Sequence, residues 1–187
     1  MESSLLTPVT VIPALKRGEV GVMPTDTVYG LVARAQDGDA VNRLYALKHR
    51  EQKPGTLIAA STEQLANLGV PLEELQKVKK WWPGSLSAVL VMNGNEYLHQ
   101  GVGDIAMRVI ADPALRNLLE QTGPLLTSSA NQPGEPGATT IAEAKQYFGN
   151  DVDFYVDGGE ITSRIPSTIV KPTANGIVIL RQGAVKI

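Results

Sequence analysis

Short apolar runs alternate along the chain with segments in which apolar residues recur at helical spacing. Runs of about four to eight residues that are rich in valine, isoleucine and leucine are typical of strands. Such runs predict strands at residues 20–24, 56–60, 86–92, 104–110, 125–128, 154–157, 168–171 and 177–181. The alternation of strands and helices predicts an α/β or α+β fold, in which helices pack on a β-sheet.

Three of the expected helices begin at capping signals. A short polar side chain just before a helix accepts a hydrogen bond from a free backbone N–H group, and a Glu or Gln three residues later can return the contact. Proline suits the first helical position because its missing N–H group would have no partner there. The three signals are Asp112 before Pro113, Ser61 before Gln64, and Thr140 before Glu143.

Another helix is expected at residues 39–48, where Val41 and Leu44 belong to an apolar stripe. Its end is basic, which suits the partial negative charge at the carboxyl end of a helix. The helix therefore brings Lys48 and Arg50 together at one end.

The chain has 187 residues, 43% of them hydrophobic, and no long linker or internal repeat divides it. This length suits one core, so residues 1–187 are expected to form a single domain. No run of about 18 apolar residues predicts a membrane span, and the amino terminus lacks the pattern of an export signal. A cytoplasmic protein without membrane contact is therefore expected.

Charge and composition exclude several classes of site. The chain has no cysteine and only two histidines, His49 and His99, so no protein-bound metal site is predicted. The net charge of −2 is not that of a protein that coats nucleic acid. Any contact with a polyanion must be local.

Two polar clusters at strand ends, where open α/β sheets usually bind ligands, are rich in hydroxyl groups. They are residues 24–31 (PTDTVYGL) and 127–134 (TSSANQPG). Small hydroxyl and amide side chains can hydrogen-bond a polar ligand and still leave room for it. The alternative is a pair of turns whose side chains satisfy only their own backbone.

Two further clusters are basic. Residues 48–55 (KHREQKPG) carry three cations, a pattern that can hold a polyphosphate, although a solvated helix end explains many charge runs. Arg108 and Arg181 interrupt apolar strands, and Ser167-Thr168 belongs with them near the carboxyl end. Because a buried charge is costly unless paired, each arginine should face a carboxylate, a phosphate or the solvent edge of the sheet.

Familiar phosphate and nucleophile motifs are absent from the sequence. There is no G-x-x-x-x-G-K-[ST] loop, no G-x-G-x-x-G turn that opens a helix, and no G-x-S-x-G elbow. Hydrolysis by a serine nucleophile is therefore not expected.

Seven short motifs, taken in order, resemble those of the YrdC/TsaC family of threonylcarbamoyl-AMP synthases. They lie at residues 24–31, 48–50, 83–87, 106–109, 129–131, 167–170 and 180–183. The sequence has Ala59-Ala60 where longer relatives have a histidine, and it resembles the short, single-domain type. The resemblance implies a twisted mixed sheet with flanking helices and a positively lined cavity.

The resemblance also implies roles for nine residues. The family's catalytic tetrad corresponds to Lys48, Arg50, Ser129 and Asn131. The threonine-binding residues correspond to Thr27, Arg108 and Ser167. The ATP-binding residues correspond to Arg50, Asn131, Thr139 and Arg181.

The implied enzyme is a nucleotidyltransferase that joins L-threonine, bicarbonate and ATP, with Mg²⁺ on the ATP, into threonylcarbamoyl-AMP for the modification of adenosine next to the anticodon in tRNA. Its implied partners are downstream tRNA threonylcarbamoyl-transfer proteins, and a direct contact with tRNA or another RNA stays open. Two alternatives remain: a non-catalytic RNA-binding protein, and a paralogue of this fold that acts on a different acyl-adenylate. The aromatic content of 5% does not favour RNA binding by base stacking.

Overall fold

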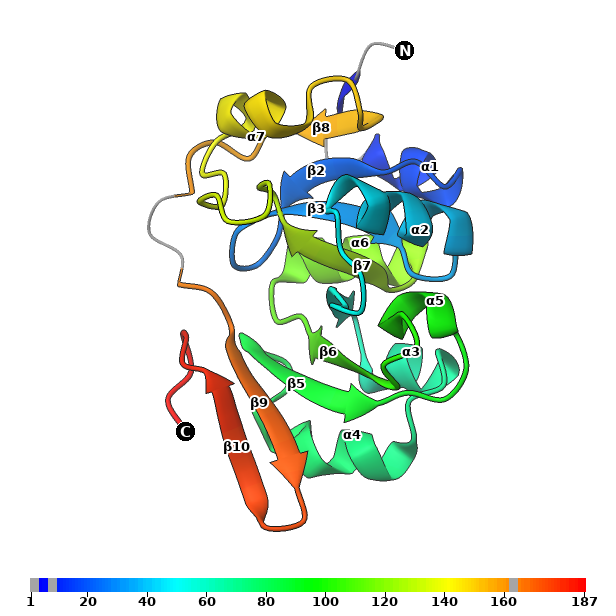
Figure 1. Ribbon diagram of the computed structural model, residues 1–187, viewed down its shortest axis with the longest axis vertical. Coiled ribbons are helices and arrows are strands. Elements are labelled where there is room, and N and C mark those ends of the chain that lie inside the picture. The colour runs from blue at the N-terminus through cyan, green and yellow to red at the C-terminus, as the bar shows by residue number, and fades with distance from the viewer. Residues whose placement is uncertain (1–3, 7–9, 162–164) are drawn as a thin grey trace.

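Ten strands form one mixed sheet in the computed structural model, which describes residues 4–6, 10–161 and 165–187 (Figure 1). Part of the amino-terminal stretch in which no export signal is expected, residues 1–3 and 7–9, lies outside the described residues. The strands are β1 (Ser4–Leu6), β2 (Gly21–Pro24), β3 (Tyr29–Arg34), β4 (Thr56–Ala59), β5 (Leu86–Val91), β6 (Asp104–Val109), β7 (Leu125–Ser129), β8 (Phe154–Val156), β9 (Thr168–Thr173) and β10 (Gly176–Arg181). The predicted fold class is confirmed.

The sheet order, β1-β8-β2-β3-β7-β4-β6-β5-β9-β10, joins segments that are far apart in the sequence. The pairs β1–β8, β2–β8, β4–β6 and β5–β9 are parallel, and the other neighbours are antiparallel. In the middle of the sheet Thr56 of β4 lies in register with Thr127 of β7 and Ala106 of β6. Because residues in register point to the same face, this part of the sheet presents polar side chains on one side.

Helices cover both faces of the sheet (Figure 1). One core cluster contains residues of α1 (Val11–Lys16) and α6 (Pro113–Thr122). The other contains residues from the remaining α-helices, which are α2 (Gly38–Leu47), α3 (Thr62–Asn67), α4 (Leu72–Val78), α5 (Glu96–His99) and α7 (Ile141–Phe148). A short 3-10 helix, Lys79–Trp81, follows α4. No helix among the described residues is long and apolar enough to cross a membrane.

The three capping signals are confirmed. Asp112, Ser61 and Thr140 each accept a hydrogen bond from the backbone N–H group three residues later, at 2.8, 3.3 and 3.2 Å. The return contacts differ from those of a capping box, because the Gln64 and Glu143 side chains accept from the N–H groups of residues 60 and 139, one position before the cap. The starts of α3 and α7 are therefore fixed from both sides.

Sequence patterns miss several elements. The helices α1, α4 and α5 have no side-chain cap, so they lack the local signal that marks the others. Strand β3 follows the turn at 25–28 directly and contains Gly30, a residue that normally weakens a strand. Here the glycine is required, because a Cβ atom at this position would lie 2.4 Å from Thr127 Oγ1.

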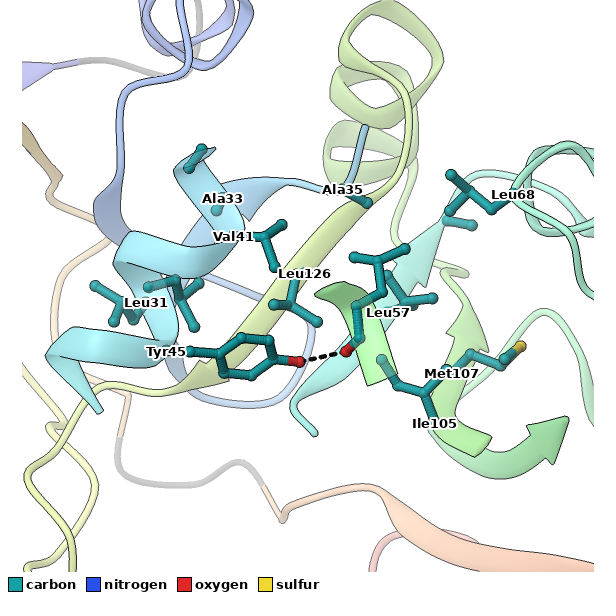
Figure 2. Close-up of a cluster of buried hydrophobic side chains, with 14 of the residues drawn as sticks. Leu31, Ala33, Ala35, Val41, Tyr45, Leu57, Leu68, Ile105, Met107 and Leu126 are labelled. Atoms are coloured by element: carbon teal, nitrogen blue, oxygen red, sulfur yellow. Dashed lines mark hydrogen bonds between the residues drawn. The ribbon is translucent and has the colours of Figure 1, made fainter. Parts of the chain in front are cut away.

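Tyr45 links α2 to the centre of the core. Figure 2 shows its ring among Leu31, Leu57 and Leu126, which come from three strands. Its hydroxyl donates to Leu98 O at 2.5 Å and so finds the partner that a buried tyrosine needs. Burial raises the pKa of Tyr45 to about 12.

Candidate active site

A pocket of about 690 Å³ opens beside the middle of the sheet. Its wall combines the β2–β3 turn, the loop between α2 and β4, strand residues from β4 to β7, and the β9–β10 end of the sheet. The polar and charged side chains in the wall are Thr25, Thr27, Arg50, Thr56, Asp104, Arg108, Thr127, Ser128, Ser129, Ser167 and Arg181. Six of the nine residues singled out from the sequence are among them: Thr27, Arg50, Arg108, Ser129, Ser167 and Arg181.

Arg108 extends from β6 and is 3% exposed. Its Nε atom lies 3.0 Å from Asp26 Oδ2, and its NH2 atom lies 2.5 Å from Asp26 Oδ1. The same NH2 group is 3.5 Å from Thr27 Oγ1. The expectation that Arg108 must face a carboxylate or another partner is met by Asp26, and the two-point contact fixes the plane of the guanidinium group.

Arg181 lies at the end of β10 and contacts Ser167. Its NH2 group donates to Ser167 O at 2.8 Å and lies 3.2 Å from Ser167 Oγ, which is 3.0 Å from Ser87 Oγ. Partial burial, followed by the positive charge of Arg108, lowers the pKa of Arg181. These contacts bring the carboxyl-terminal hairpin up to the threonine-rich wall.

Arg50 lies in the loop after α2. Its NH1 group contacts the carbonyl oxygens of Pro54 at 3.3 Å and Lys53 at 3.5 Å. Burial lowers the pKa of Arg50, and the nearby Tyr45 acts in the opposite direction. Within the described ranges, neither Arg50 nor Arg181 forms an ion pair with a carboxylate.

Lys48 lies behind the pocket wall. The side chain is 1% exposed, and its ammonium group donates to Ser129 O at 2.9 Å, to Asn131 Oδ1 at 2.9 Å and to Asn131 O. Ser129 Oγ adds a bond to Asn131 Oδ1 at 2.6 Å. The four residues predicted as a tetrad thus lie in one region. Lys48, Ser129 and Asn131 share one network, and Arg50 and Ser129 line the pocket. Burial, followed by the charge of Arg50, lowers the pKa of Lys48 to about 8.

Asn131 and Thr139 do not belong to the pocket wall. The Asn131 amide donates to Glu135 O at 2.5 Å and so shapes the turn after β7. The Thr139 hydroxyl donates to Glu143 Oε2 at 3.0 Å, next to the start of α7. In this structure the Thr139 hydroxyl therefore serves the helix start, and its role toward ATP stays a prediction.

Sequence reasoning misses two polar wall positions on regular strands. Thr56 begins the otherwise apolar β4, and Asp104 begins β6. An odd polar residue on the face of an apolar strand is the signal that could have identified them. Asp104 pairs with Lys171 at 2.6 Å, so its charge is already compensated.

The wall suits an anionic ligand. Three guanidinium groups line a cavity with many hydroxyl groups: one is neutralised by Asp26, and the other two pair with no carboxylate of the described residues. Among the described residues, no group of three or more His, Asp or Glu side chains could hold a metal ion.

Fold and site together define an α/β protein with a cationic, hydroxyl-lined pocket beside the middle of its sheet. A model of the Sua5/YciO/YrdC family, described as "Telomere recombination", matches residues 13–183. The chain belongs to this family, which confirms the resemblance seen in its motifs.

Relatives and solved structures agree with this assignment. A threonylcarbamoyl-AMP synthase of Halorhodospira halophila is 36% identical over 150 residues, covering 77% of this chain and 78% of the relative. One of Pseudoalteromonas translucida is 32% identical over 175 residues, covering 89% and 93%. The crystal structure of Pyrococcus abyssi Sua5 complexed with L-threonine superposes with a TM-score of 0.82 at 30% identity, covering 98% of this chain and 57% of that one.

Proposed function

We propose that the chain is a threonylcarbamoyl-AMP synthase, a nucleotidyltransferase that forms threonylcarbamoyl-AMP and pyrophosphate from L-threonine, bicarbonate and ATP. The observation that carries the proposal is the pocket that Arg50 and Arg181 line together with the buried Arg108 and Thr27; in the described part of the chain no carboxylate pairs with Arg50 or Arg181. The relatives named as synthases support the chemistry. The product serves tRNA threonylcarbamoyl-transfer proteins, and we place the reaction in the cytoplasm.

The threonine side of the reaction is assigned to Arg108, Thr27 and Ser167. Arg108 binds the threonine carboxylate, and Asp26 holds the guanidinium in place and limits its excess charge. Hydroxyl groups of the wall pair with the threonine hydroxyl, which would otherwise lose its hydrogen bonds to water. The amine of threonine then attacks bicarbonate carbon, and loss of water leaves an N-carboxylate.

The ATP side is assigned to Arg50 and Arg181. The N-carboxylate oxygen attacks the α-phosphorus, the bond to the β-phosphate oxygen breaks, and pyrophosphate leaves with that electron pair. Two unit charges 4 Å apart repel by about 4 kcal/mol at an effective dielectric of 20. Fixed guanidinium groups offset this repulsion where the two anions meet, and no residue is needed as a nucleophile.

Mg²⁺ enters as part of the MgATP substrate. Asp26 and Asp104 are the carboxylates near the pocket wall, and each already pairs with a cation, Arg108 or Lys171. Triphosphate oxygens and water are therefore the fitting ligands for the ion, as is usual for this metal.

In this proposal Lys48 positions the turn at residues 129–131. Its three N–H donors all point to the turn at residues 129–131, so it holds Ser129 at the wall and does not reach the substrates. The Asn131 side chain completes the same turn. This assignment modifies the role expected for Lys48 and Asn131 from the resemblance.

The test is release of pyrophosphate, with threonylcarbamoyl-AMP identified by mass spectrometry. Release should require L-threonine and bicarbonate together, and omission of either should abolish it. Pyrophosphate released without threonine would contradict the proposal and would favour a paralogue that acts on another acyl group. Binding of RNA with no turnover of ATP would favour the RNA-binding alternative.

A further inference from the structure

Gln100, the residue directly after α5, bridges two backbone groups of the loop that carries Arg50. Its Nε2 group donates to Arg50 O at 2.9 Å, and its Oε1 atom accepts from Lys53 N at 2.9 Å. The oxygen and the nitrogen of one amide side chain therefore both bind backbone groups of residues that lie about fifty positions earlier in the chain. A long-range contact of this kind fixes the loop against a different element.

After Lys48, whose ammonium group is bound to residues 129 and 131, the loop has no regular structure to hold its shape. Residues 48–55 form no helix or strand, and His49 and Gln52 have left-handed backbone conformations with φ of 47° and 52°. At the far end of the loop Gly55 N donates to the Tyr45 hydroxyl at 3.1 Å, and this hydroxyl donates in turn to Leu98 O. Both ties thus lead to α5 and the residue that follows it.

The Arg50 side chain depends on the path of this loop. Its guanidinium group rests on the carbonyl oxygens of Lys53 and Pro54. Gln100 holds the backbone at Arg50 and at Lys53, so it sets the distance between the residue that bears the cation and the carbonyl groups that orient it. With no carboxylate pairing Arg50 in the described part of the chain, these contacts are what aim the charge into the pocket.

We infer that Gln100 is a positioning residue that clamps the 50–53 loop and so aims Arg50 at the triphosphate of ATP. The inference rests on the proposed role of Arg50 in ATP binding. A glutamine suits the position because its amide supplies a donor for Arg50 O and an acceptor for Lys53 N. Its two methylene groups give the side chain the length to reach both. Glutamate lacks the donor, leucine lacks both, and asparagine is too short to span the two groups.

The test combines proteolysis of the free protein with ATP titration, using Gln100→Leu and Gln100→Asn. Trypsin cleavage at the Arg50–Glu51 bond should be about tenfold faster in both variants, because the loop opens more often. The dissociation constant for MgATP, measured by calorimetry, should rise about tenfold, because a misplaced guanidinium loses its contact. Affinity for L-threonine alone should stay within about twofold, since Arg108 is held by Asp26.

The asparagine variant separates the clamp from the backbone conformation. Gln100 has φ of 50°, a region in which asparagine is more at ease than glutamine or leucine. If only the turn mattered, Gln100→Asn would match the wild type, and this result would overturn the inference. The exposed Gln76 of α4 supplies the matched control, because Gln76→Leu makes the same chemical change away from the loop and should alter neither readout.

Two further outcomes would also overturn the inference: unchanged cleavage at residue 50, or faster cleavage with unchanged affinity for MgATP. Failure of the proposed function has a different signature. A wild-type protein that binds MgATP and releases no pyrophosphate would refute the synthase activity while the titration still tests the clamp.

Discussion

The two sides of the pocket hold their cations in different ways. Arg108 extends from a regular strand, is buried, and is paired with Asp26 before any ligand arrives. Arg50 lies on an irregular loop and Arg181 at the last residue of an edge strand, and both contact backbone carbonyl groups or hydroxyls. The first arrangement is costly to disturb and is rigid. The second leaves the positive charge of Arg50 and Arg181 free to bind an anionic ligand, and hydrogen bonds of the two side chains orient the guanidinium groups.

The difference suits the two proposed substrates. Threonine is small, and a fixed, partly neutralised guanidinium selects its carboxylate without attracting every anion. The triphosphate of ATP carries more charge, and cations without carboxylate partners favour it most. Stability should therefore depend on the Arg108 side, and nucleotide affinity on the Arg50 and Arg181 side.

The largest expected effect is on the Arg108 side. Asp26→Ala leaves a buried guanidinium without its partner, which should lower the free energy of unfolding by about 3–5 kcal/mol. Urea denaturation measures this loss. A decrease below about 1 kcal/mol would mean that water or another group replaces Asp26, and the contrast between the two sides would fail.

Arg50→Ala and Arg181→Ala should show the opposite profile. We expect kcat/KM for ATP to fall by about two orders of magnitude, close to 3 kcal/mol of transition-state stabilisation. The free energy of unfolding should change by no more than about 0.5 kcal/mol, as is usual for partly exposed side chains. Steady-state kinetics and urea denaturation on the same preparations measure kcat/KM and the free energy of unfolding. Equal losses in stability for Arg50→Ala and Asp26→Ala would contradict the proposed difference between the two sides of the pocket.

Lys48 should reveal itself through the pH dependence of stability. Its pKa is about 8 in the folded protein and near the ordinary 10.5 when unfolded, so the unfolded chain binds more protons between these values. The free energy of unfolding should therefore rise with pH by about 2 kcal/mol between pH 7 and pH 10, relative to Lys48→Met. The upper limit avoids Tyr45, whose pKa is raised to about 12 and whose contribution has the opposite sign. If the free energy of unfolding changes with pH in the same way in the wild type and in Lys48→Met, the pKa of Lys48 is not lowered in the folded protein.

The smallest expected effect is selectivity for the amino acid. L-Threonine should be used about tenfold more efficiently than L-valine, because valine would leave a polar group of the wall unpaired at a cost of about 1–3 kcal/mol. Pyrophosphate release with each amino acid measures the ratio, and Thr27→Val should reduce it. Equal use of both amino acids would contradict the assignment of the hydroxyl-lined wall to threonine.

Local chemistry makes part of the structure predictable. Asp112, Ser61 and Thr140 act within three residues, so their capping roles can be read from neighbouring positions. The sheet order cannot be read in this way, because β7 pairs with β3 and β4 only after the chain has returned from far away. Strand β3 is hidden because the reason for its glycine, the close approach of Thr127, lies in another strand.

The candidate site shows the same limit. The cost of burying a charge predicts that Arg108 needs a partner, and the fold identifies that partner as Asp26. Lys48 looks like a pocket cation in the sequence because it lies beside Arg50. Its partners are two main-chain carbonyl groups and one amide oxygen of residues 129 and 131, and main-chain acceptors leave no mark in the sequence. A solvated pocket cation could be replaced with little loss of stability, whereas the buried network of Lys48 predicts that Lys48→Ala destabilises the fold.

The pocket wall takes residues from the β2–β3 turn through to Arg181 at the end of β10. During synthesis on the ribosome, the first of these residues emerge long before the last. A nascent chain cannot assemble the complete wall until β10 has left the exit tunnel and paired with β9. The Arg181 side of the wall is therefore completed after the Arg108 side.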